Sequence, residues 1–341
     1  MTAIGLPLKL GAALAALFLL TLSLWLGAAI GETSIPLEIV AKAFANRVWQ
    51  AGYPIDPIDE GIIWSYRLSR VVVAACCGSA LALSGVVLQS LLRNPLADPY
   101  VLGISAGAST GAVSVAILGF GGGLVGLPLG AFAGALLAFL AVSLLAMRAG
   151  RGSAAIILAG VAGSQLFHAL TSFIVTKAAN AEQARGIMFW LLGNLSGVRW
   201  PDVGLALPTA LAGLAICLAQ ARSLDAFAFG KESAASLGIP VRRVYAVLIA
   251  ATAMMTAVMV SLVGSIGFVG LVIPHATRML VGVRHGTLLP AAAVIGAIFM
   301  VLADILSRIL IAGQVLPIGV VTALFGAPAF ALIMSQRRAS L

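Results

Sequence analysis

Long apolar segments alternate with short polar ones along the whole chain. Most apolar segments are close to the ~20 residues that an α-helix needs to cross the hydrocarbon core of a bilayer. There are ten of them, at residues 8–30, 62–92, 99–120, 124–147, 153–176, 202–220, 242–264, 266–282, 288–311 and 315–335. The pattern predicts an all-α polytopic membrane protein with ten transmembrane helices, forming one membrane domain over residues 1–341.

The composition supports a membrane protein and excludes an ordinary soluble domain. Of the 341 residues, 61% are hydrophobic and 9% are charged, against roughly 25% charged residues in soluble proteins. The first apolar run, residues 8–30, exceeds the ~7–15 residues of a signal-peptide core, so we expect a membrane helix there. The three cysteines, Cys76, Cys77 and Cys217, lie in apolar runs without metal-ligand spacing, and we expect them to be buried hydrophobic residues.

The charges predict an orientation in the membrane rather than a nucleic-acid partner. The net charge is +9, but the basic residues are spread over short loops instead of forming one patch. With the N-terminus inside, the inner segments hold twelve Lys and Arg against three Asp and Glu, and the outer segments hold eight against eight. Inner loops of membrane proteins are enriched in Lys and Arg, so both termini are expected to be cytoplasmic.

Two outer segments and one glycine series add detail. Residues 31–61 contain DPIDEGIIW and are expected to form a polar loop. Residues 177–201 contain an apolar stretch too short to span, so a short re-entrant or surface helix is expected there. Gly103, Gly107 and Gly111 are four residues apart on one helix face and predict close approach of a neighbouring helix.

The segment 222–243 is unusually polar and holds six charged residues. It predicts two short helices on the inner side, the first capped by Ser223 and ended by Gly230, the second closed by Gly238. Their small apolar surface and mixed charge fit a groove on a cytoplasmic protein better than the membrane surface. The stretch FGKES lacks the Gly and the Ser or Thr that a phosphate-binding loop requires, so no nucleotide site is expected in this chain.

Two alternatives from other functional classes are open at this point. GISAG, residues 103–107, matches the G-x-S-x-G pattern of serine hydrolases without the preceding strand, and an intramembrane protease would use Ser105 with His168 or His275. An ion-coupled secondary transporter would need acidic residues in mid-membrane or a broken-helix ion site. Asp304 is the nearest case, but Arg308 lies four residues later and is placed to pair with it.

Polar residues at three further places have both structural and functional interpretations. His168 and Gln165 share a helix face in the fifth span, where they form an interhelical hydrogen bond or line a pathway. Arg67 and Arg70 lie at the outer end of a helix. We expect them either to reach lipid headgroups or, together with Arg308, to bind an acidic patch on a soluble partner. The segment RNPLADP, residues 93–99, contains two prolines that forbid a continuous helix. It is either a tight turn between two helices or a constriction at the inner mouth of a transport path.

Four long motifs occur together and in order: RNPLADPYVLGISAGASTGA, GKESAASLGIP, GSIGFVGLVIPHATRMLVG and LPIGVVTALFGAPAFALIM. Together they resemble the FecCD-type permeases of type II ABC importers, which include cobalamin, haem and ferric-siderophore permeases. The resemblance covers nearly the whole chain from Tyr66 to Met334. It implies ten membrane helices, a second permease subunit (identical or a close paralogue) and a bacterial inner-membrane location with lipid around the chain.

The resemblance also implies partners and the residues that contact them. Two cytoplasmic ATPase subunits would bind ATP and Mg, so this chain itself would have no cofactor. They would contact Leu224, Lys231, Glu232, Ala235, Leu237 and Gly238. A periplasmic substrate-binding protein would dock onto Arg67, Arg70 and Arg308. The cytoplasmic gate would contain Asn94, Pro95 and Leu96, and the pathway lining would include Gln165, His168, Met188 and Trp190.

The function implied is transport without covalent chemistry in this chain, which is therefore not expected to be an enzyme. The expected activity is ATP-driven import of an iron chelate, a ferric siderophore or haem, by alternating access. Cobalamin is the alternative cargo. Specificity would lie mainly in the binding protein.

Overall fold

The computed structural model describes residues 6–338 except 32, 34, 151, 152 and 179. Within these residues the secondary structure is helical, and no β-strand is formed. The first half contains α1 Leu6–Ala29, α2 Leu37–Trp49, α3 Pro57–Gly61, the π-helix η1 Ile62–Leu68, α4 Ser69–Leu92, the 3₁₀ helix η2 Pro99–Leu102, α5 Ile104–Ala116, α6 Leu127–Ala149 and α7 Ser153–Val175. The second half contains α8 Ala181–Leu191, α9 Trp200–Ala219, α10 Ala221–Phe227, α11 Lys231–Ser236, α12 Val241–Val263, α13 Val269–Val281, α14 His285–Ile309 and α15 Ile318–Arg338.

Helices long enough to cross a bilayer form where the sequence is most apolar, because a helix satisfies its backbone hydrogen bonds internally. Within the described residues, seven helical segments are long and apolar enough to span a membrane. Three shorter apolar helices, Ile104–Ala116, Val269–Val281 and Ile318–Ile333, fall within three more of the expected segments. The prediction of an all-helical polytopic membrane protein is confirmed, whereas the count of ten spans stays a prediction.

The polar segment 31–61 was expected to be a loop, and this expectation is wrong. It contains α2, which is amphipathic and buries Val40 and Ala43, and the short α3. Asp56 caps α3 by accepting the Ile58 backbone N–H, and Pro57 occupies the first helical turn. Sequence reasoning missed the helical period because it assigned the charged residues of this segment to a loop.

The short helices of segments 177–201 and 222–243 are present, as α8 and as α10 with α11. Gly238 has a φ of +80° just after α11, the left-handed conformation expected where a helix ends. Ser223 does not cap α10, because that helix already begins at Ala221 after the single residue Gln220. The Ser223 hydroxyl instead donates to the Gln220 side chain.

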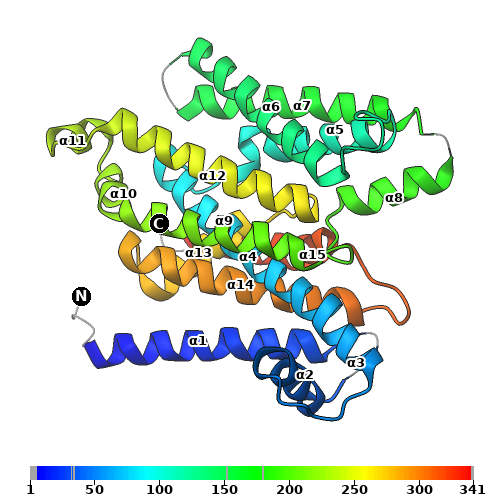
Figure 1. Ribbon diagram of the computed structural model, residues 1–341. Coiled ribbons are helices and arrows are strands. Elements are labelled where there is room, and N and C mark those ends of the chain that lie inside the picture. Colours follow the sequence, from blue (N-terminus) through cyan, green and yellow to red (C-terminus); the bar gives the residue numbers. More distant parts are fainter. Residues whose placement is uncertain (1–5, 32, 34, 151–152, 179, 339–341) are drawn as a thin grey trace.

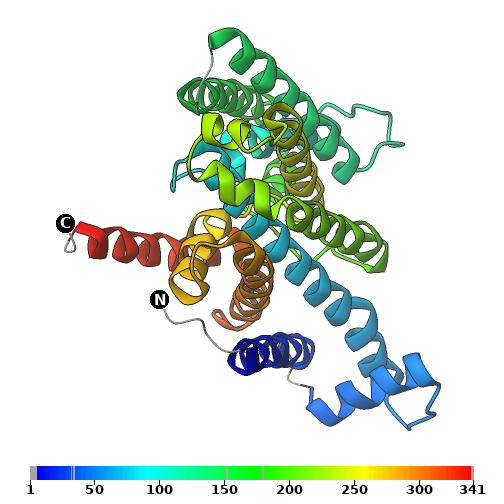
Figure 2. The ribbon, with the colours of Figure 1, turned by 90° about the vertical axis from the view of Figure 1, so that its left-hand side faces the viewer.

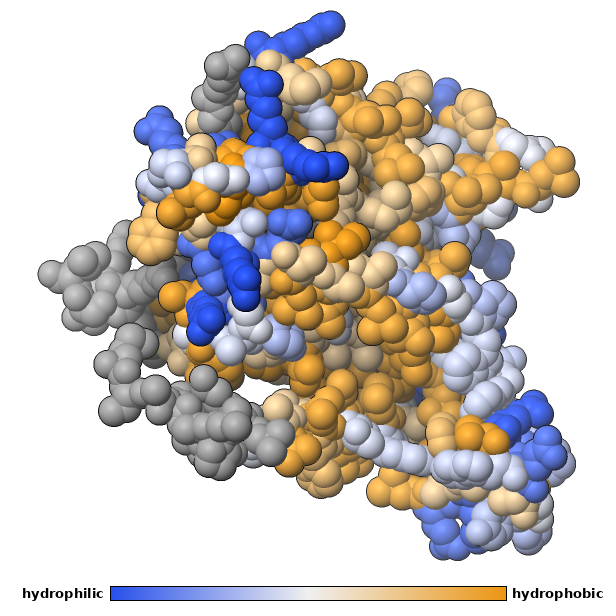
Figure 3. All heavy atoms as spheres, turned by 60° about the vertical axis from the view of Figure 1, so that its left-hand side comes forward, coloured by the Kyte–Doolittle hydropathy of each residue, from blue (hydrophilic) through white to orange (hydrophobic). Residues whose placement is uncertain are grey.

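The long helices run side by side between two polar ends. Helices α10 and α11 lie at one end, where α1 also begins, and α2, α3 and α8 lie at the other (Figure 1). Between them the surface is a broad hydrophobic band, with hydrophilic residues gathered toward both ends (Figure 3). Seen along the bundle, α15 projects away from the other helices (Figure 2).

The core centres on α4, most of whose residues are buried, including Cys76 and Cys77. Cys217 is also buried, which confirms the expectation for all three thiols. Glycines allow neighbouring backbones to touch: a Cβ atom on Gly107 would lie 2.4 Å from the Gly134 carbonyl oxygen, and one on Gly111 would lie 2.1 Å from that of Gly130. The predicted close approach at these two glycines is confirmed, and the neighbour is α6.

Candidate coupling and gate region

Helix α10 is tied to the bundle by a buried apolar face. Leu224 is fully buried and Phe227 nearly so, and both belong to the main hydrophobic core. Leu224 therefore offers no exposed surface in this conformation, and its direct contact with an ATPase stays a prediction. Its side chain instead fixes the position of α10 against the membrane helices.

A chain of polar contacts joins α10 to α14 and α4. The Asp225 carboxylate accepts the backbone N–H of His285, at 2.8 Å, and lies 2.7 Å from His285 Nδ1. The other ring nitrogen, Nε2, lies 2.7 Å from Ser90 Oγ near the end of α4. Because Asp225 faces the N-terminus of α14, it also interacts favourably with the free N–H groups there.

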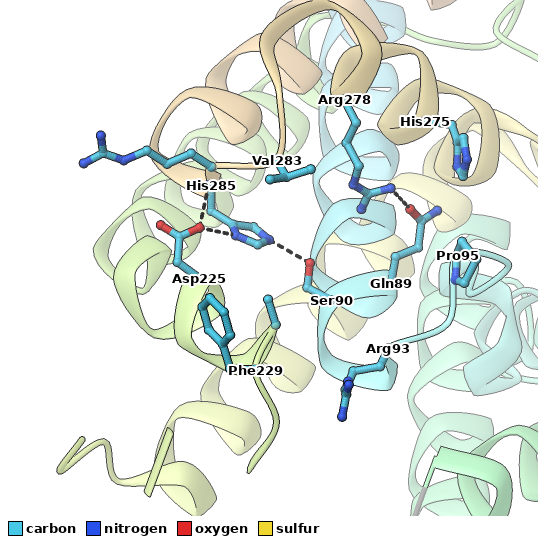
Figure 4. A pocket seen from close by; sticks show the side chains of 12 residues that line it. Gln89, Ser90, Arg93, Pro95, Asp225, Phe229, His275, Arg278, Val283 and His285 are labelled. Carbon is cyan, nitrogen blue, oxygen red and sulfur yellow. Dashed lines mark hydrogen bonds and ion pairs between the residues drawn. The ribbon is translucent and has the colours of Figure 1, made fainter. Parts of the chain in front are cut away.

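These residues form one wall of a cavity of about 540 Å³ at the same end of the molecule. Arg93, Arg278 and Arg284 also line it, so its rim is strongly basic. Figure 4 shows Asp225, His285 and Ser90 in one line across the cavity, with Gln89 and Arg278 paired beside them. The cavity thus lies between α10 and the end of α4, where the predicted gate turn begins.

The predicted gate residues Asn94, Pro95 and Leu96 form a tight turn directly after α4. Arg93 ends α4 with a φ of +51°. The Asn94 side chain accepts the Leu96 backbone N–H at 2.9 Å, which stabilises the turn locally. Pro95 and Leu96 are exposed, so an apolar tip stands at this end of the chain.

The residues after the turn pack against the segment that leads into α13. Asp98 accepts the Tyr100 backbone N–H, and the Tyr100 hydroxyl donates to the Ile266 carbonyl oxygen at 2.9 Å. Gly270 is needed here, because a Cβ atom would lie 2.7 Å from Pro99 Cδ. Burial raises the pKa of the Asp98 carboxyl to about 6, although the Tyr100 N–H acts in the opposite direction.

Helix α11 presents most of its predicted coupling residues outward. Ala234 is fully buried and anchors the helix, whereas Glu232, Ala235 and Gly238 are exposed. Leu237 is 71% exposed, an unusual position for a large apolar side chain outside the hydrophobic band. Lys231 is exposed as well, and its Nζ lies over the ring of Tyr245 at 4.4 Å from the centroid.

The three arginines predicted to dock a partner are buried, at 7%, 9% and 6% exposure for Arg67, Arg70 and Arg308. Arg70 and Arg308 both pair with the fully buried Asp304, at 2.7 and 3.1 Å. Arg308 also donates to the carbonyl oxygen of Gly27, and Arg67 donates to that of Ala29. The arginines thus satisfy backbone carbonyl groups in the last turn of α1, which otherwise have no partner within the helix.

The exposure that docking or headgroup contact requires is therefore absent for these three side chains in this conformation. The physical reason is that α1, α4 and α14 converge where the arginines lie, which the chain order does not reveal. Other cations at the same end are more accessible. Arg47 is exposed near the Trp64 ring, and the half-buried Arg199 lies 4.2 Å from the centroid of Tyr66.

The residues predicted to line the pathway are not gathered around a cavity of the single chain. Gln165 and His168 are exposed on α7, and Met188 is 56% exposed on α8. Trp190 is half-buried and packs against the core cluster that includes α5. A pathway role for these residues stays a prediction, because only a second subunit would enclose them.

The structure also bears on the protease alternative and on metals. Ser105 Oγ lies 2.7 Å from Ser265 Oγ, so its hydrogen-bond partner is a second hydroxyl. Within the described residues, no group of three or more His, Cys, Asp or Glu side chains is arranged to hold a metal ion. A hydroxyl is not the base that a serine nucleophile requires, so the Ser105 contact gives no support to catalysis at GISAG.

Comparison with known proteins identifies the chain. The FecCD transport family matches residues 17–336. The chain belongs to the FecCD transport family. The resemblance seen in the four sequence motifs is confirmed.

Several FecCD-family relatives share about two residues in five with it. The cobalamin import system permease protein BtuC of Halobacterium salinarum is 42% identical over 89% of this chain and 80% of its own length. The uncharacterized ABC transporter permease protein YvrB of Bacillus subtilis is 40% identical over 93% and 91%. The vitamin B12 import system permease protein BtuC of Escherichia coli is 40% identical over 89% and 92%.

A solved structure gives the same answer for the fold. A transporter assigned to the metal-chelate type of ABC transporters, in an inward-facing conformation, superimposes with a TM-score of 0.82. It is 31% identical, and the match covers 95% of this chain and 98% of the other. This FecCD-family chain is thus the membrane permease of an ABC importer.

Sequence reasoning missed Ser90 and His285 as members of the coupling region. They are 195 positions apart in the chain and neither belongs to a short pattern. The only signal was the placement of both at the inner ends of predicted spans, next to basic residues. Such a signal places residues at the same membrane surface but does not pair them.

Proposed function

We propose that this permease imports a large metal chelate, with two copies of the chain enclosing the path and two ATPase subunits bound at α10 and α11. A separate binding protein delivers the chelate at the opposite end. The observation that carries the proposal is the 40–42% identity to permeases named for cobalamin import, together with the match to a metal-chelate type transporter.

Cobalamin and ferric chelates are both members of this cargo class. The names of the relatives favour cobalamin, and the FecCD resemblance includes ferric-siderophore and haem permeases. Both cargoes are bulky and need a wide path with few strong binding groups, since tight binding along the path would slow release. The predominantly apolar composition of α7 and α15 is compatible with a path that has few strong binding groups.

In the proposed orientation, the end with α10 and α11 is cytoplasmic, and all ten apolar segments cross the membrane. The distribution of Lys and Arg supports this orientation. Of the charges used for that count, Glu32 and Arg151 lie outside the described residues. α5 and α13 would cross with help from the adjoining η2 and residues 264–268, which are buried or half-buried in protein.

The contacts described above suggest how movement of α10 reaches the gate. A partner that displaces α10 moves Asp225, which is bonded to the first residue of α14 and through His285 to Ser90 of α4. Ser90 lies three residues before Arg93, where the gate turn begins. Closing of the ATPase pair would therefore act on the end of α4 and the turn 94–96, as alternating access requires.

A single substitution on α11 tests the coupling role. Leu237→Asp places a charge where an apolar side chain is free to contact a partner, so we expect loss of ATPase-subunit binding and of ATP-driven transport in proteoliposomes. Ser236→Asp is the matched control, because it adds the same charge on the same exposed helix without removing an apolar contact. Wild-type binding of the ATPase subunit by Leu237→Asp would contradict the proposal.

The cargo is tested with the substrate-binding protein of the same transport system, which is sought first among the neighbouring genes. Its affinity for cobalamin, haem and ferric siderophores is measured first, and uptake of the tight ligand into proteoliposomes with the full complex second. ATP-dependent uptake of one of these chelates is expected. Uptake of an unchelated ion alone would contradict the proposed cargo class.

A further inference from the structure

A second cavity opens at the end of the bundle that carries α11, on the side where α6, α7 and α12 meet. Its volume is about 430 Å³. The walls are mostly apolar and are formed chiefly by Phe139, Val142, Met147, Ile156 and Ile249. The cavity is separate from the one at the gate turn and shares no residue with it.

Two polar groups stand in this apolar surrounding. The Lys231 ammonium lies at 4.4 Å from the centroid of the Tyr245 ring, and both residues line the cavity. The Tyr245 hydroxyl is buried, and among the described residues it has no hydrogen-bond partner. Because a buried hydroxyl without a partner costs free energy, this group points to a ligand that supplies an acceptor oxygen.

The charged, hydroxyl and apolar groups of this cavity together indicate which kind of ligand it would bind. A lysine ammonium binds a phosphate as a point charge, and the partnerless Tyr245 hydroxyl could donate to one of its oxygens if a small shift of the ring brings it to the cavity. The apolar walls require a hydrocarbon tail on the same molecule. Arg148 is exposed in the last turn of α6, the helix that supplies Val142 and Met147, and adds positive charge near this end.

We propose that this cavity binds an anionic phospholipid, with the phosphate held by Lys231 and Tyr245 and an acyl chain along the apolar wall. Lipid is the occupant because the cavity opens from the hydrophobic band at one polar end of the bundle, where the headgroups of a bilayer lie. Basic pockets between membrane helices are known to hold acidic headgroups. The site goes beyond the proposed function, since it requires only that the chain spans a membrane.

The lipid would connect parts of the molecule that have different roles. Lys231 is the first residue of α11, whereas the apolar wall belongs largely to α6 and α12. A bound headgroup would therefore hold the start of α11 against the bundle. Lys231 was expected to contact an ATPase, and its position over Tyr245 gives it this second role.

The test measures lipid binding to the purified full chain by native mass spectrometry, which needs no transport partner. Phosphatidylglycerol is compared with phosphatidylcholine of the same acyl chains, and with glycerol phosphate as the headgroup without a tail. Lys231→Gln removes the charge, Tyr245→Phe removes only the hydroxyl, and Ala250→Phe fills the cavity from an exposed position. Lys177→Gln is the control, because Lys177 also lies over an aromatic ring, that of Phe173, at 5.8 Å.

We expect at least one phosphatidylglycerol per chain, bound roughly tenfold more tightly than phosphatidylcholine, the size of effect typical of one charge-assisted contact. Lys231→Gln should remove most of this preference, Tyr245→Phe should weaken it, and Ala250→Phe should lower binding of both lipids at this site. Three results would overturn the proposal: no headgroup preference, an equal loss in Lys177→Gln, or glycerol phosphate binding as tightly as the lipid.

Discussion

Arg70, Asp304 and Arg308 form a buried ionic group whose members come from two helices. The carboxylate lies between two guanidinium groups and is fully buried. Such groups are costly to desolvate, and they tolerate the loss of one member badly because the remaining charge is left without compensation. The sequence predicted the Asp304–Arg308 pair from its spacing of four residues, but it did not predict Arg70 as the third member.

Asp304→Asn is expected to destabilise the protein by about 3–5 kcal/mol, because two buried arginines lose their counter-charge. The measurement is the unfolding of the purified chain in detergent. Glu38→Gln is the control: it removes an ion pair with Lys42 of the same i,i+4 spacing at an exposed position, and no measurable change is expected. Equal stability of Asp304→Asn and the wild type would contradict the structural role of this group.

Asp98 provides a pH-dependent contribution at the gate turn. Its pKa is raised to about 6, against about 3.9 in an unfolded chain, so the folded protein binds the proton more tightly. The free energy of unfolding should therefore fall as the pH rises from about 4 to about 6, and this contribution should be constant above that range.

Asp98→Asn should remove this part of the pH dependence, because its side-chain oxygen still accepts the Tyr100 N–H without titrating. The measurement is the unfolding temperature of both proteins between pH 4 and pH 7. The difference between wild type and variant is expected to change with pH in that interval. A difference that is constant with pH would show that Asp98 titrates normally.

At the scale of elements, glycines decide how closely α5 and α6 pack. The sequence predicted a small-residue face at Gly107 and Gly111, because a four-residue spacing returns to the same side of a helix. It did not identify α6 as the neighbour, or Gly130 and Gly134 as the matching face. Sequence reasoning missed α2 and α3, because it assigned the charged residues around them to a loop.

Gly111→Ala is expected to destabilise the chain by about 1–3 kcal/mol, because its Cβ atom would lie 2.1 Å from the Gly130 carbonyl oxygen and the two helices must separate. Gly204→Ala on α9 is the control, since a Cβ atom there meets no atom within 4 Å. Thermal unfolding in the same detergent compares the two. A stability of Gly111→Ala equal to that of Gly204→Ala would contradict the close packing.

For the whole molecule, the projecting α15 is the clearest sign that a single chain is incomplete. It leaves Leu324 and Phe325 exposed at 62% and 50%, and it stands apart from the bundle in Figure 2. Three of the four residues expected to line the pathway, Gln165, His168 and Met188, are also exposed on α7 and α8. Both observations agree with the proposed permease dimer, in which a second copy would cover these surfaces.

Phe325→Cys is therefore expected to form a disulfide-linked dimer in oxidised membranes, once Cys76, Cys77 and Cys217 have been replaced by Ala. Leu211→Cys on α9, where Leu211 is 57% exposed, is the control and should remain mostly monomeric. Gel electrophoresis without reducing agent measures the linked fraction. If both variants cross-link equally, collision in the membrane explains the result and the proposed interface is wrong.

The sequence by itself determined the membrane class, the family, the two short helices α10 and α11, and the turn after α4. It could do so because the length and polarity of a membrane helix, and the turn chemistry of Gly, Pro and Asn, are local properties. Only the tertiary structure decided that Arg67, Arg70 and Arg308 are buried, that Asp225 meets His285 and Ser90, and that Lys231 lies over Tyr245. These contacts join helices far apart in the chain, and their formation depends on which apolar faces pack together, which no local pattern encodes.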